Sequence, residues 1–198
     1  MARRGFFVCV EGLDGCGKTT QARLLVKQLK WKGHDAIYTT EPSHGKIGTL
    51  IRRHCLNRDE RVSTIIEALL FAADRFDHVT ALVKPAINDG RLVVSDRYVY
   101  SSLAYQGAAG LDLDWIKNIN VHAIPPDLAI FIDVEPETVM KRLKPFRSVM
   151  ENLKIQRSVR EVYMKLVGNG ELTRIDGNRS KREISADLLR LVLDSIKT

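Results

Sequence analysis

The sequence predicts an α/β protein with a five-stranded parallel sheet flanked by helices, built as one domain over residues 1–198. Short apolar runs alternate with longer segments of helical periodicity, and this alternation is typical of parallel strands joined by helices. A glycine-rich loop follows the first apolar run directly, at the end of a strand where such sheets bind ligands. No apolar run approaches the length of a membrane span, so no membrane association is expected.

Five apolar runs have the length and composition of buried strands. They occupy residues 6–10, 36–40, 92–95, 128–134 and 172–175. Each is followed by polar or glycine-containing sequence that can form a turn or begin a helix. The runs are therefore expected to be the strands of the sheet.

Helical spacing of apolar residues predicts the segments that cover the sheet. The first predicted helix ends near Gly33, and the last carries Ile184, Leu188 and Val192 on one face. A third helical segment, residues 63–88, has a long apolar stripe: Ile65, Leu69, Ala72, Phe76, Val79 and Val83. The stripes of the first and last helices are expected to pack in the core, and the third stripe forms one apolar face of its segment.

Phe71 and Arg75 stand off this long stripe and, as i, i+4 neighbours, share a second face of the same helix. An aromatic ring and a guanidinium on one face suit stacking on, and hydrogen bonding to, a flat ring. The alternative is that Phe71 packs against a neighbouring helix while Arg75 is solvated.

The loop after the first apolar run matches the phosphate-binding pattern G-x-x-x-x-G-K-[ST]. Its strand–loop–helix context predicts that backbone N–H groups and the helix N-terminus bind the phosphates of a nucleoside triphosphate. Lys18 can reach the β- and γ-phosphates, and the Thr19 hydroxyl can bind Mg²⁺. The residues expected to hold the nucleotide are Gly12, Leu13, Asp14, Gly15, Cys16, Gly17, Lys18, Thr19 and Thr20.

A second polar site follows the apolar run at residues 92–95, where Asp96 and Arg97 are adjacent. In phosphate-loop enzymes an Asp at such a strand end lies near the metal, so Asp96 is a predicted Mg²⁺ ligand together with Thr19. Arg97 can bind a second anionic group through a bidentate contact, and the alternative is a buried structural Asp96–Arg97 pair. Asp14 would repel a triphosphate that it faced, so it is expected to face a sugar hydroxyl or Arg97.

Charge and cysteine content narrow the classes of function. The net charge of +7 comes from dispersed basic residues, with no basic tail or aromatic–basic interleaving, so no nucleic-acid partner is expected. Cys9, Cys16 and Cys55 show no C-x-x-C spacing, which indicates a reducing, cytoplasmic location rather than disulfides or zinc. Cys16 is either an inert small residue or, beside helix-end N–H groups, a thiol of lowered pKa.

Five segments together resemble the thymidylate kinase family. They are EGLDGCGKTTQ at 11–21, EP at 41–42, FAADR at 71–75, DRYVYSSLAYQG at 96–107 and PDLAIFIDV at 126–134. The similarity covers nearly the whole chain in order, and the run at 96–107 distinguishes this family from other phosphate-loop enzymes. It implies a P-loop nucleotide kinase that phosphorylates dTMP to dTDP with ATP and Mg²⁺, usually as a homodimer.

The resemblance implies roles in an acceptor site by matching position. Phe71 would stack on the thymine ring, and Arg75 would bond its carbonyl. Ser102 would lie near the edge of the base, and Gln106 belongs to the same signature and the same substrate site. These residues would select the base.

The resemblance also implies roles around the sugar and phosphate of the acceptor. Arg97 would hold the acceptor phosphate, and Asp14 would approach the 3′-hydroxyl of the sugar. Tyr105 would lie against the C2′ edge of the sugar and disfavour ribonucleotides. Lys18, Asp14 and Arg97 are thus the predicted catalytic residues around the transferring phosphoryl group.

Two departures from the family pattern concern positive charge near the phosphates. Thr40 stands where the T-R-E-P pattern has Arg, with His44 or Lys46 as nearby substitutes. Gly15 stands where some members carry a basic loop residue, and members without that residue tend to place an Arg in a mobile lid. The second departure indicates that the basic segment following residue 140 can supply the charge that the loop lacks.

A short lid is expected at approximately residues 141–151. Arg142 and Arg147 are the two candidates for a catalytic lid arginine. The alternative is that these basic residues form a solvated helix end.

Two other functions stay open on the sequence. One is a kinase for another nucleoside monophosphate, such as dUMP, although Phe71, Arg75 and Tyr105 favour a flat base on a deoxysugar. The other is a phosphate-loop ATPase or switch without a nucleotide acceptor, which would leave Asp14 and the Asp-Arg-Tyr sequence at 96–98 unexplained.

Overall fold

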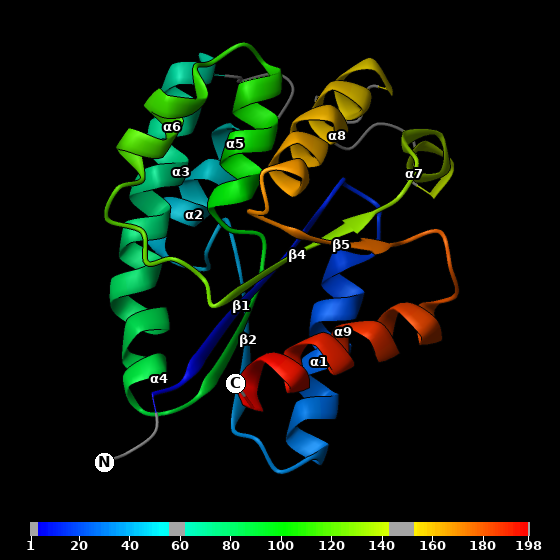
Figure 1. Cartoon of the computed structure of the whole chain (residues 1–198). Coiled ribbons are helices and arrows are strands. Elements are labelled where there is room, and N and C mark those ends of the chain that lie inside the picture. Colours follow the sequence, from blue (N-terminus) through cyan, green and yellow to red (C-terminus); the bar gives the residue numbers. More distant parts are fainter. Residues whose placement is uncertain (1–3, 56–61, 143–152, 198) are drawn as a thin grey trace.

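A computed structural model describes residues 4–55, 62–142 and 153–197 of the chain. Its centre is a sheet of five strands in the order β2-β3-β1-β4-β5, with every neighbouring pair parallel (Figure 1). The strands are β1 (Phe6–Gly12), β2 (Ala36–Thr40), β3 (Leu92–Asp96), β4 (Leu128–Asp133) and β5 (Thr173–Asp176). The predicted fold class is confirmed, and each strand begins at or within one residue of its predicted start.

Helices fill the connections between the strands, and a last helix follows β5. They are α1 (Lys18–Trp31), α2 (Lys46–His54), α3 (Thr64–His78), the π-helical turn η1 (Val79–Val83), α4 (Lys84–Asn88), α5 (Val99–Ala108), α6 (Leu113–Ile119), α7 (Pro136–Arg142), α8 (Leu153–Gly168) and α9 (Lys181–Lys197). The first predicted helix ends as expected, because Gly33 adopts a φ of 87° just after α1.

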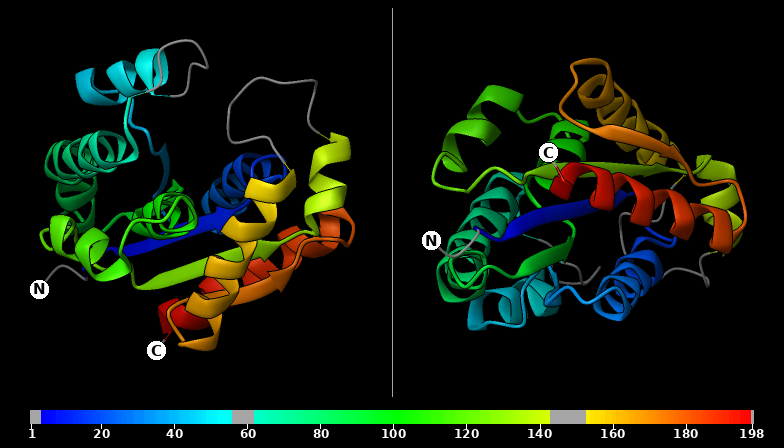
Figure 2. Two further views of the ribbon diagram at one scale, coloured as in Figure 1. Left: turned by 90° about the horizontal axis from the view of Figure 1, so that it is seen from above. Right: turned by 60° about the horizontal axis from the view of Figure 1, so that its bottom comes forward.

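The strand order decides which face each helix covers. The chain crosses from β1 to β2 in one direction and returns through β3, β4 and β5 in the other. Right-handed crossovers therefore place α1 on one face and α3 to α8 on the opposite face. The helix α9 contacts both α1 and β5, and it lies beside β5 in both views of Figure 2.

The core lies around the neighbouring strands β1 and β3, whose side chains are buried on both faces of the sheet. Val8, Val10, Val93 and Val94 are fully buried, as expected for strands covered by helices on each side. Because the strands are parallel, their carboxyl ends meet at one edge. In the described ranges, none of the helices has the length and apolarity that a bilayer crossing demands.

The apolar stripe predicted for residues 63–88 is only partly buried. Ile65 and Leu69 are 53% and 46% exposed, whereas Asp74 and Arg75 of the same helix are buried. The helix α3 packs against α2, α5, α6 and η1, whereas the later α4 packs against β3. Ile65 and Leu69 lie outside the covered face because the first turns of α3 bury the opposite side, where Glu67 accepts a hydrogen bond from Gln106 and Ala68 is packed.

Candidate active site

The phosphate loop joins β1 to α1 at the carboxyl edge of the sheet. Gly12 ends β1 with a φ of 155°, and a Cβ atom there would lie 2.9 Å from the carbonyl oxygen of Ile132 in β4. Gly17 precedes α1 in the left-handed conformation, with a φ of 96°. The first turn of α1 carries no acidic residue, so the positive end of the helix suits an anion.

Lys18 is folded onto this loop. Its Nζ donates a hydrogen bond to the carbonyl oxygen of Leu13 at 3.1 Å and lies 3.5 Å from Oδ1 of Asp14. Only 6% of Lys18 is exposed. Its ammonium group is thus held at the loop, where an anion bound to the backbone N–H groups would meet it.

Cys16 lies within the loop but is shielded from solvent. Its side chain is packed so closely that Sγ would be 2.6 Å from a Cβ atom at Gly12. Burial raises the pKa of the thiol, although the charge of Lys18 acts in the opposite direction. The alternative of a thiol with a lowered pKa is therefore wrong, and Cys16 is a small buried residue.

Thr19 and Asp96 meet where α1 begins and β3 ends. The Thr19 hydroxyl donates to Oδ2 of Asp96 at 2.5 Å, and the Tyr38 hydroxyl donates to the same oxygen at 3.3 Å. Oδ1 of Asp96 is buried and accepts no hydrogen bond within the described part of the chain. A hydroxyl beside a carboxylate with a free oxygen suits a Mg²⁺ ion that also binds nucleotide oxygens.

The described residues offer no larger metal site. No group of three or more His, Cys, Asp and Glu side chains within residues 4–55, 62–142 and 153–197 could hold a metal ion. Thr19 and Asp96 fit Mg²⁺ because this ion keeps several waters and takes few protein ligands at phosphate sites.

Asp14 and Arg97 form a close ion pair between the phosphate loop and the start of α5. Nη2 of Arg97 lies 2.5 Å from Oδ1 of Asp14, and Nη1 donates to the Ser101 hydroxyl at 2.8 Å. The Tyr105 hydroxyl donates to Oδ2 of Asp14 at 3.2 Å, and the Arg97 guanidinium lies 5.0 Å from the centre of the Tyr105 ring. The expectation that Asp14 faces Arg97 is confirmed.

These contacts set the charge states of the pair. Burial disfavours the Asp14 carboxylate, but the charges of Arg97 and Lys18 outweigh it and hold the pKa of Asp14 below its ordinary value. Asp96 takes its own hydrogen bonds from Thr19 and Tyr38. The alternative of a structural Asp96–Arg97 pair is therefore wrong.

The backbone of Arg97 is in the left-handed region, with a φ of 74°, the one such value for a non-glycine residue among those described. The segment is fixed by several hydrogen bonds: Arg97 N–H donates to the Val10 carbonyl at 3.0 Å, and the Ser95 hydroxyl donates to the Arg97 carbonyl at 2.7 Å. Such a conformation persists only where surrounding contacts impose it, and it is commonly found at functional sites.

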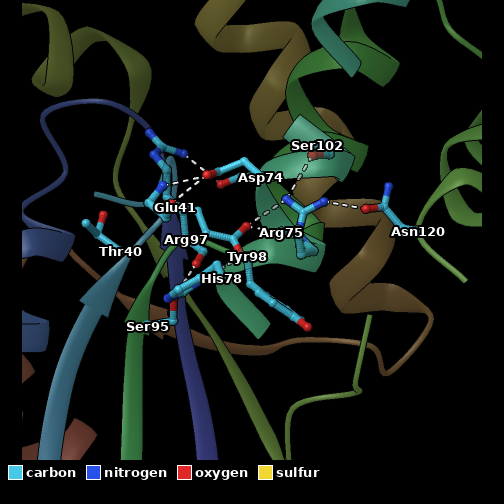
Figure 3. A network of polar contacts seen from close by, with 12 residues as sticks. Thr40, Glu41, Asp74, Arg75, His78, Ser95, Arg97, Tyr98, Ser102 and Asn120 are labelled. Carbon is cyan, nitrogen blue, oxygen red and sulfur yellow. Dashed lines mark hydrogen bonds and ion pairs between the residues drawn. The ribbon is translucent and has the colours of Figure 1, made fainter. Parts of the chain in front are cut away.

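Arg75 lies at the centre of a buried polar cluster (Figure 3). Its Nε and Nη2 lie 2.9 and 2.8 Å from Oε2 of Glu41, and its other contacts are the side-chain oxygens of Asn120 and Ser102 at 2.5 and 3.1 Å. Only 1% of Arg75 is exposed, so the alternative of a solvated Arg75 is wrong. Its contact with Glu41 brings α3 to the end of β2.

The other predicted base-site residues lie around this cluster. Ser102 is joined directly to Arg75, whereas Gln106, one turn further along α5, donates to Glu67 at 2.7 Å. Phe71 lies one turn before Arg75 on α3 and is half-buried. The structure thus brings Arg75 and Ser102 into contact and holds Gln106 through a different partner.

The segment after β2 shows how the chain accommodates Thr40. The Thr40 hydroxyl donates to the Asp96 carbonyl at 3.1 Å, and His44 and Lys46 are exposed. Arg52 of α2 instead reaches this segment and donates to the Ser43 carbonyl at 2.5 Å and to the Pro42 carbonyl. The arginine that meets residues 42–43 therefore comes from a later helix.

The predicted lid is described only at its beginning. Arg142 is exposed at the end of α7. Arg147 lies outside the described residues, as does most of the segment 141–151. The choice between the two arginines remains a prediction.

Three further residues of this region, for which the sequence patterns indicate no role, are buried and hydrogen-bonded: Glu11, Glu41 and Asn120. Glu41 and Asn120 hold Arg75, and Glu11 accepts hydrogen bonds around the start of α5. A carboxylate at the end of an apolar strand was the available signal for Glu11 and Glu41, because a buried charge needs partners.

Taken together, the fold and this edge of the sheet define the class of protein. A parallel sheet with a phosphate loop, a threonine–aspartate pair and a buried arginine beside that loop is the arrangement of a P-loop nucleotide kinase.

The comparisons with known proteins give the family. The family model described as thymidylate kinase matches residues 10–188. The chain is 43% identical over 197 residues to a protein of Thermococcus onnurineus named "Probable thymidylate kinase", covering 94% of this chain and 96% of that protein. It is 38% identical over 200 residues to a protein of Halothermothrix orenii named "Thymidylate kinase", covering 96% and 97%. The chain belongs to the thymidylate kinase family and is a phosphotransferase, as the sequence predicts.

Proposed function

We propose that this protein transfers the γ-phosphoryl group of ATP to dTMP. The observation that carries the proposal is the position of Arg97, which lies beside the phosphate loop and is paired with Asp14 of that loop. A phosphate-loop ATPase without an acceptor has no need for a second arginine in this position. The family relationship supports the same reaction.

On the side of the phosphoryl donor, Lys18 and the N–H groups at the start of α1 would neutralise the phosphates of ATP. Thr19 and Asp96 would hold Mg²⁺, which supplies charge neutralisation at the β- and γ-phosphates when it is bound. A lid arginine, Arg142 or Arg147, would add positive charge over the same group. Alignment and charge neutralisation are the main demands of phosphoryl transfer.

On the side of the acceptor, Arg97 would bind the phosphate of dTMP, and Asp14 would accept a hydrogen bond from the 3′-hydroxyl. Phe71 would stack on the thymine, with Arg75 and Ser102 at its edge and Gln106 nearby. The monophosphate needs no general base, because its second pKa of about 6 leaves it mostly dianionic at neutral pH.

The test is ATP turnover with a panel of acceptors at fixed ATP and Mg²⁺. We expect ADP formation that depends on dTMP, is weaker with dUMP and is unaffected by single-stranded DNA. The Lys18→Ala variant serves as the control for contaminating ATPases. Equal turnover with and without dTMP would contradict the proposal and favour an ATPase or switch.

We further infer that the protein is a homodimer through the exposed apolar face of α3. Ile65, Ile66 and Leu69 on this helix are 46–53% exposed, and Leu50 of the adjoining α2 is 43% exposed. Contiguous exposed apolar residues are typical of interaction sites.

An Ile66→Lys substitution is expected to yield a monomer in sedimentation velocity. The matched control is Trp31→Lys, at an 85% exposed apolar residue at the end of α1. A wild-type monomer at micromolar concentration would contradict the inference.

The cysteines support a reducing, cytoplasmic location. Cys9, Cys16 and Cys55 are free and buried, so they form no disulfide in the structure. The whole chain would then act as one kinase domain with its lid near residues 141–151.

A further inference from the structure

Glu11 is a buried carboxylate at the end of β1, directly before Gly12 of the phosphate loop. It is fully buried, and it accepts four hydrogen bonds. Oε1 accepts from the backbone N–H groups of Tyr98 at 2.7 Å and Ser101 at 3.2 Å. Oε2 accepts from the hydroxyl groups of Ser101 at 2.6 Å and Tyr163 at 2.8 Å.

The first consequence concerns the start of α5. Tyr98 precedes this helix, and its own side chain does not cap the first turn. Glu11 accepts the N–H groups at this end instead, and its negative charge suits the positive end of the helix. A carboxylate on β1 therefore fixes the position of the helix that follows Arg97.

The second consequence concerns the Arg97 side chain. The Ser101 hydroxyl donates to Glu11 and accepts from Nη1 of Arg97 at 2.8 Å. Nη2 of the same guanidinium is bound by Asp14. Glu11 is thus linked to Arg97 at two points. It accepts the N–H of Tyr98, the next residue, and it accepts the hydroxyl of Ser101, which in turn accepts from one end of the guanidinium.

The third consequence concerns α8, the helix that follows the predicted lid. Its Tyr163 donates to Glu11, lies 3.2 Å from the Ser101 hydroxyl and stacks on Phe131 of β4 with ring centres 4.6 Å apart. A single carboxylate therefore joins the strand that leads into the phosphate loop, the start of α5 and α8.

We propose that Glu11 is a positioning residue that orients Arg97 for the acceptor phosphate, acting through Ser101 and the start of α5. The proposal rests on the proposed function, in which Arg97 binds the phosphate of dTMP. Glu11 itself touches no substrate in this scheme. Its effect is expected on the acceptor rather than on ATP, because the phosphate loop keeps its own glycines, Lys18 and Thr19.

The first experiment measures steady-state kinetics of Glu11→Gln with each substrate varied in turn. Glutamine keeps the shape of the side chain but removes the charge and one acceptor, so the hold on Ser101 and Arg97 weakens. We expect the KM for dTMP to rise about tenfold with little change in the KM for ATP. The matched control is Asp127→Asn, because Asp127 accepts the N–H of Phe7 at 2.7 Å at the opposite end of β1. This control is expected to leave both KM values unchanged.

The second experiment asks whether Glu11 acts through Arg97. In the Arg97→Lys background the guanidinium that Ser101 orients is absent, so Glu11→Gln is expected to add less than about twofold to the KM for dTMP. Independent effects would instead multiply. If the effects of Glu11→Gln and Arg97→Lys on the KM for dTMP multiply in full, the positioning role is overturned. Equal rises in the KM for ATP and for dTMP in Glu11→Gln would overturn it as well.

Two further variants keep the test informative if Glu11→Gln does not fold, as judged by thermal melting. Ser101→Ala removes the hydroxyl between Glu11 and Arg97, and Tyr163→Phe removes one hydrogen bond to Glu11 while keeping the stacked ring. Both are expected to raise the KM for dTMP selectively, Ser101→Ala more than Tyr163→Phe. Unchanged values in both overturn the proposal. If Arg97→Lys alone leaves dTMP kinetics unchanged, it is the role of Arg97 in the proposed function that fails.

Discussion

Oδ1 of Asp14 lies 2.5 Å from Nη2 of Arg97, so the phosphate loop and the residue after β3 are joined by a direct ion pair. The two residues are far apart in sequence, and each comes from the carboxyl end of a different strand. The pair places an arginine next to the loop while part of its charge is balanced by the loop itself. A bound acceptor phosphate would therefore meet an arginine that is already oriented.

Arg97→Lys tests this orientation. A lysine keeps the charge, but a single ammonium cannot replace a planar guanidinium that contacts Asp14 and Ser101 at its two ends. We expect turnover with dTMP to fall at least about tenfold, with little change in ATP affinity measured by calorimetry. Unchanged turnover would assign Arg97 a structural role.

Lys18→Ala is expected to remove activity while the fold is kept. The side chain makes only a hydrogen bond to Leu13 and a 3.5 Å contact with Asp14 among the contacts described, so melting should change little. Loss of one charge at the transferring phosphoryl group lowers turnover by roughly a thousandfold. Turnover and melting temperature are measured on the same preparation, and a folded variant with near-normal turnover would contradict the assignment.

Phe71→Ala is the cleaner test of the base site. We expect it to weaken dTMP binding more than ATP binding in calorimetry, because Phe71 is half-buried beside the proposed base position. Arg75→Ala is expected to weaken dTMP binding as well, but also to destabilise the protein by about 3–5 kcal/mol, because it leaves the buried Glu41 carboxylate without its main partner. If Phe71→Ala weakens the binding of dTMP and of ATP equally, the ring of Phe71 has a packing role only.

Tyr105 is expected to select the sugar. A ring against C2′ leaves no room and no hydrogen-bond partner for a hydroxyl, a penalty of about 1–3 kcal/mol. Tyr105→Ala should therefore raise the kcat/KM of the ribose analogue relative to dTMP, even as overall activity falls. Tyr105→Phe is the control, because it keeps the ring and loses only the hydroxyl that bonds Asp14. If the ratio of kcat/KM for the ribose analogue to that for dTMP is unchanged in Tyr105→Ala, another residue selects the sugar, and Asp14 is the next candidate.

The lowered pKa of Asp14 predicts a specific dependence of stability on pH. Since the pKa is lower in the folded than in the unfolded protein, the ionised pair stabilises the fold above the unfolded value of about 4. That contribution is lost as the pH falls through and below this value. Between pH 6 and pH 3.5 the melting temperature of the wild type should therefore fall more than that of Asp14→Asn. Parallel curves would show that Asp14 has no shifted pKa.

The strands and the phosphate loop were predictable from sequence because their signals are local. Apolar runs gave each strand start to within one residue, and the loop pattern includes the glycines that the backbone geometry requires. The contact of Asp14 with Arg97 was also accessible, because a carboxylate inside a phosphate loop must face away from the anion.

The polar interior around α3 was not predictable in the same way. Helical spacing identified a stripe through Ile65 and Leu69, but it does not say which face the rest of the chain covers. The covered face is the one with Asp74 and Arg75, because Ser43 and Glu41 supply partners for them from the segment after β2. The role of Glu11 was not predictable for the same reason: its four hydrogen bonds come from three residues, Tyr98, Ser101 and Tyr163, which lie far along the chain.

The shielded thiol of Cys16 offers a way to watch the phosphate loop in solution. Since the sulfur is buried and its pKa is raised, an alkylating reagent such as iodoacetamide can reach it only when the loop opens. The rate of labelling at Cys16, followed by peptide mass spectrometry, therefore reports how often the loop opens. A nucleotide that closes the loop should slow the labelling of Cys16, while Cys9 inside β1 stays protected with or without ligand.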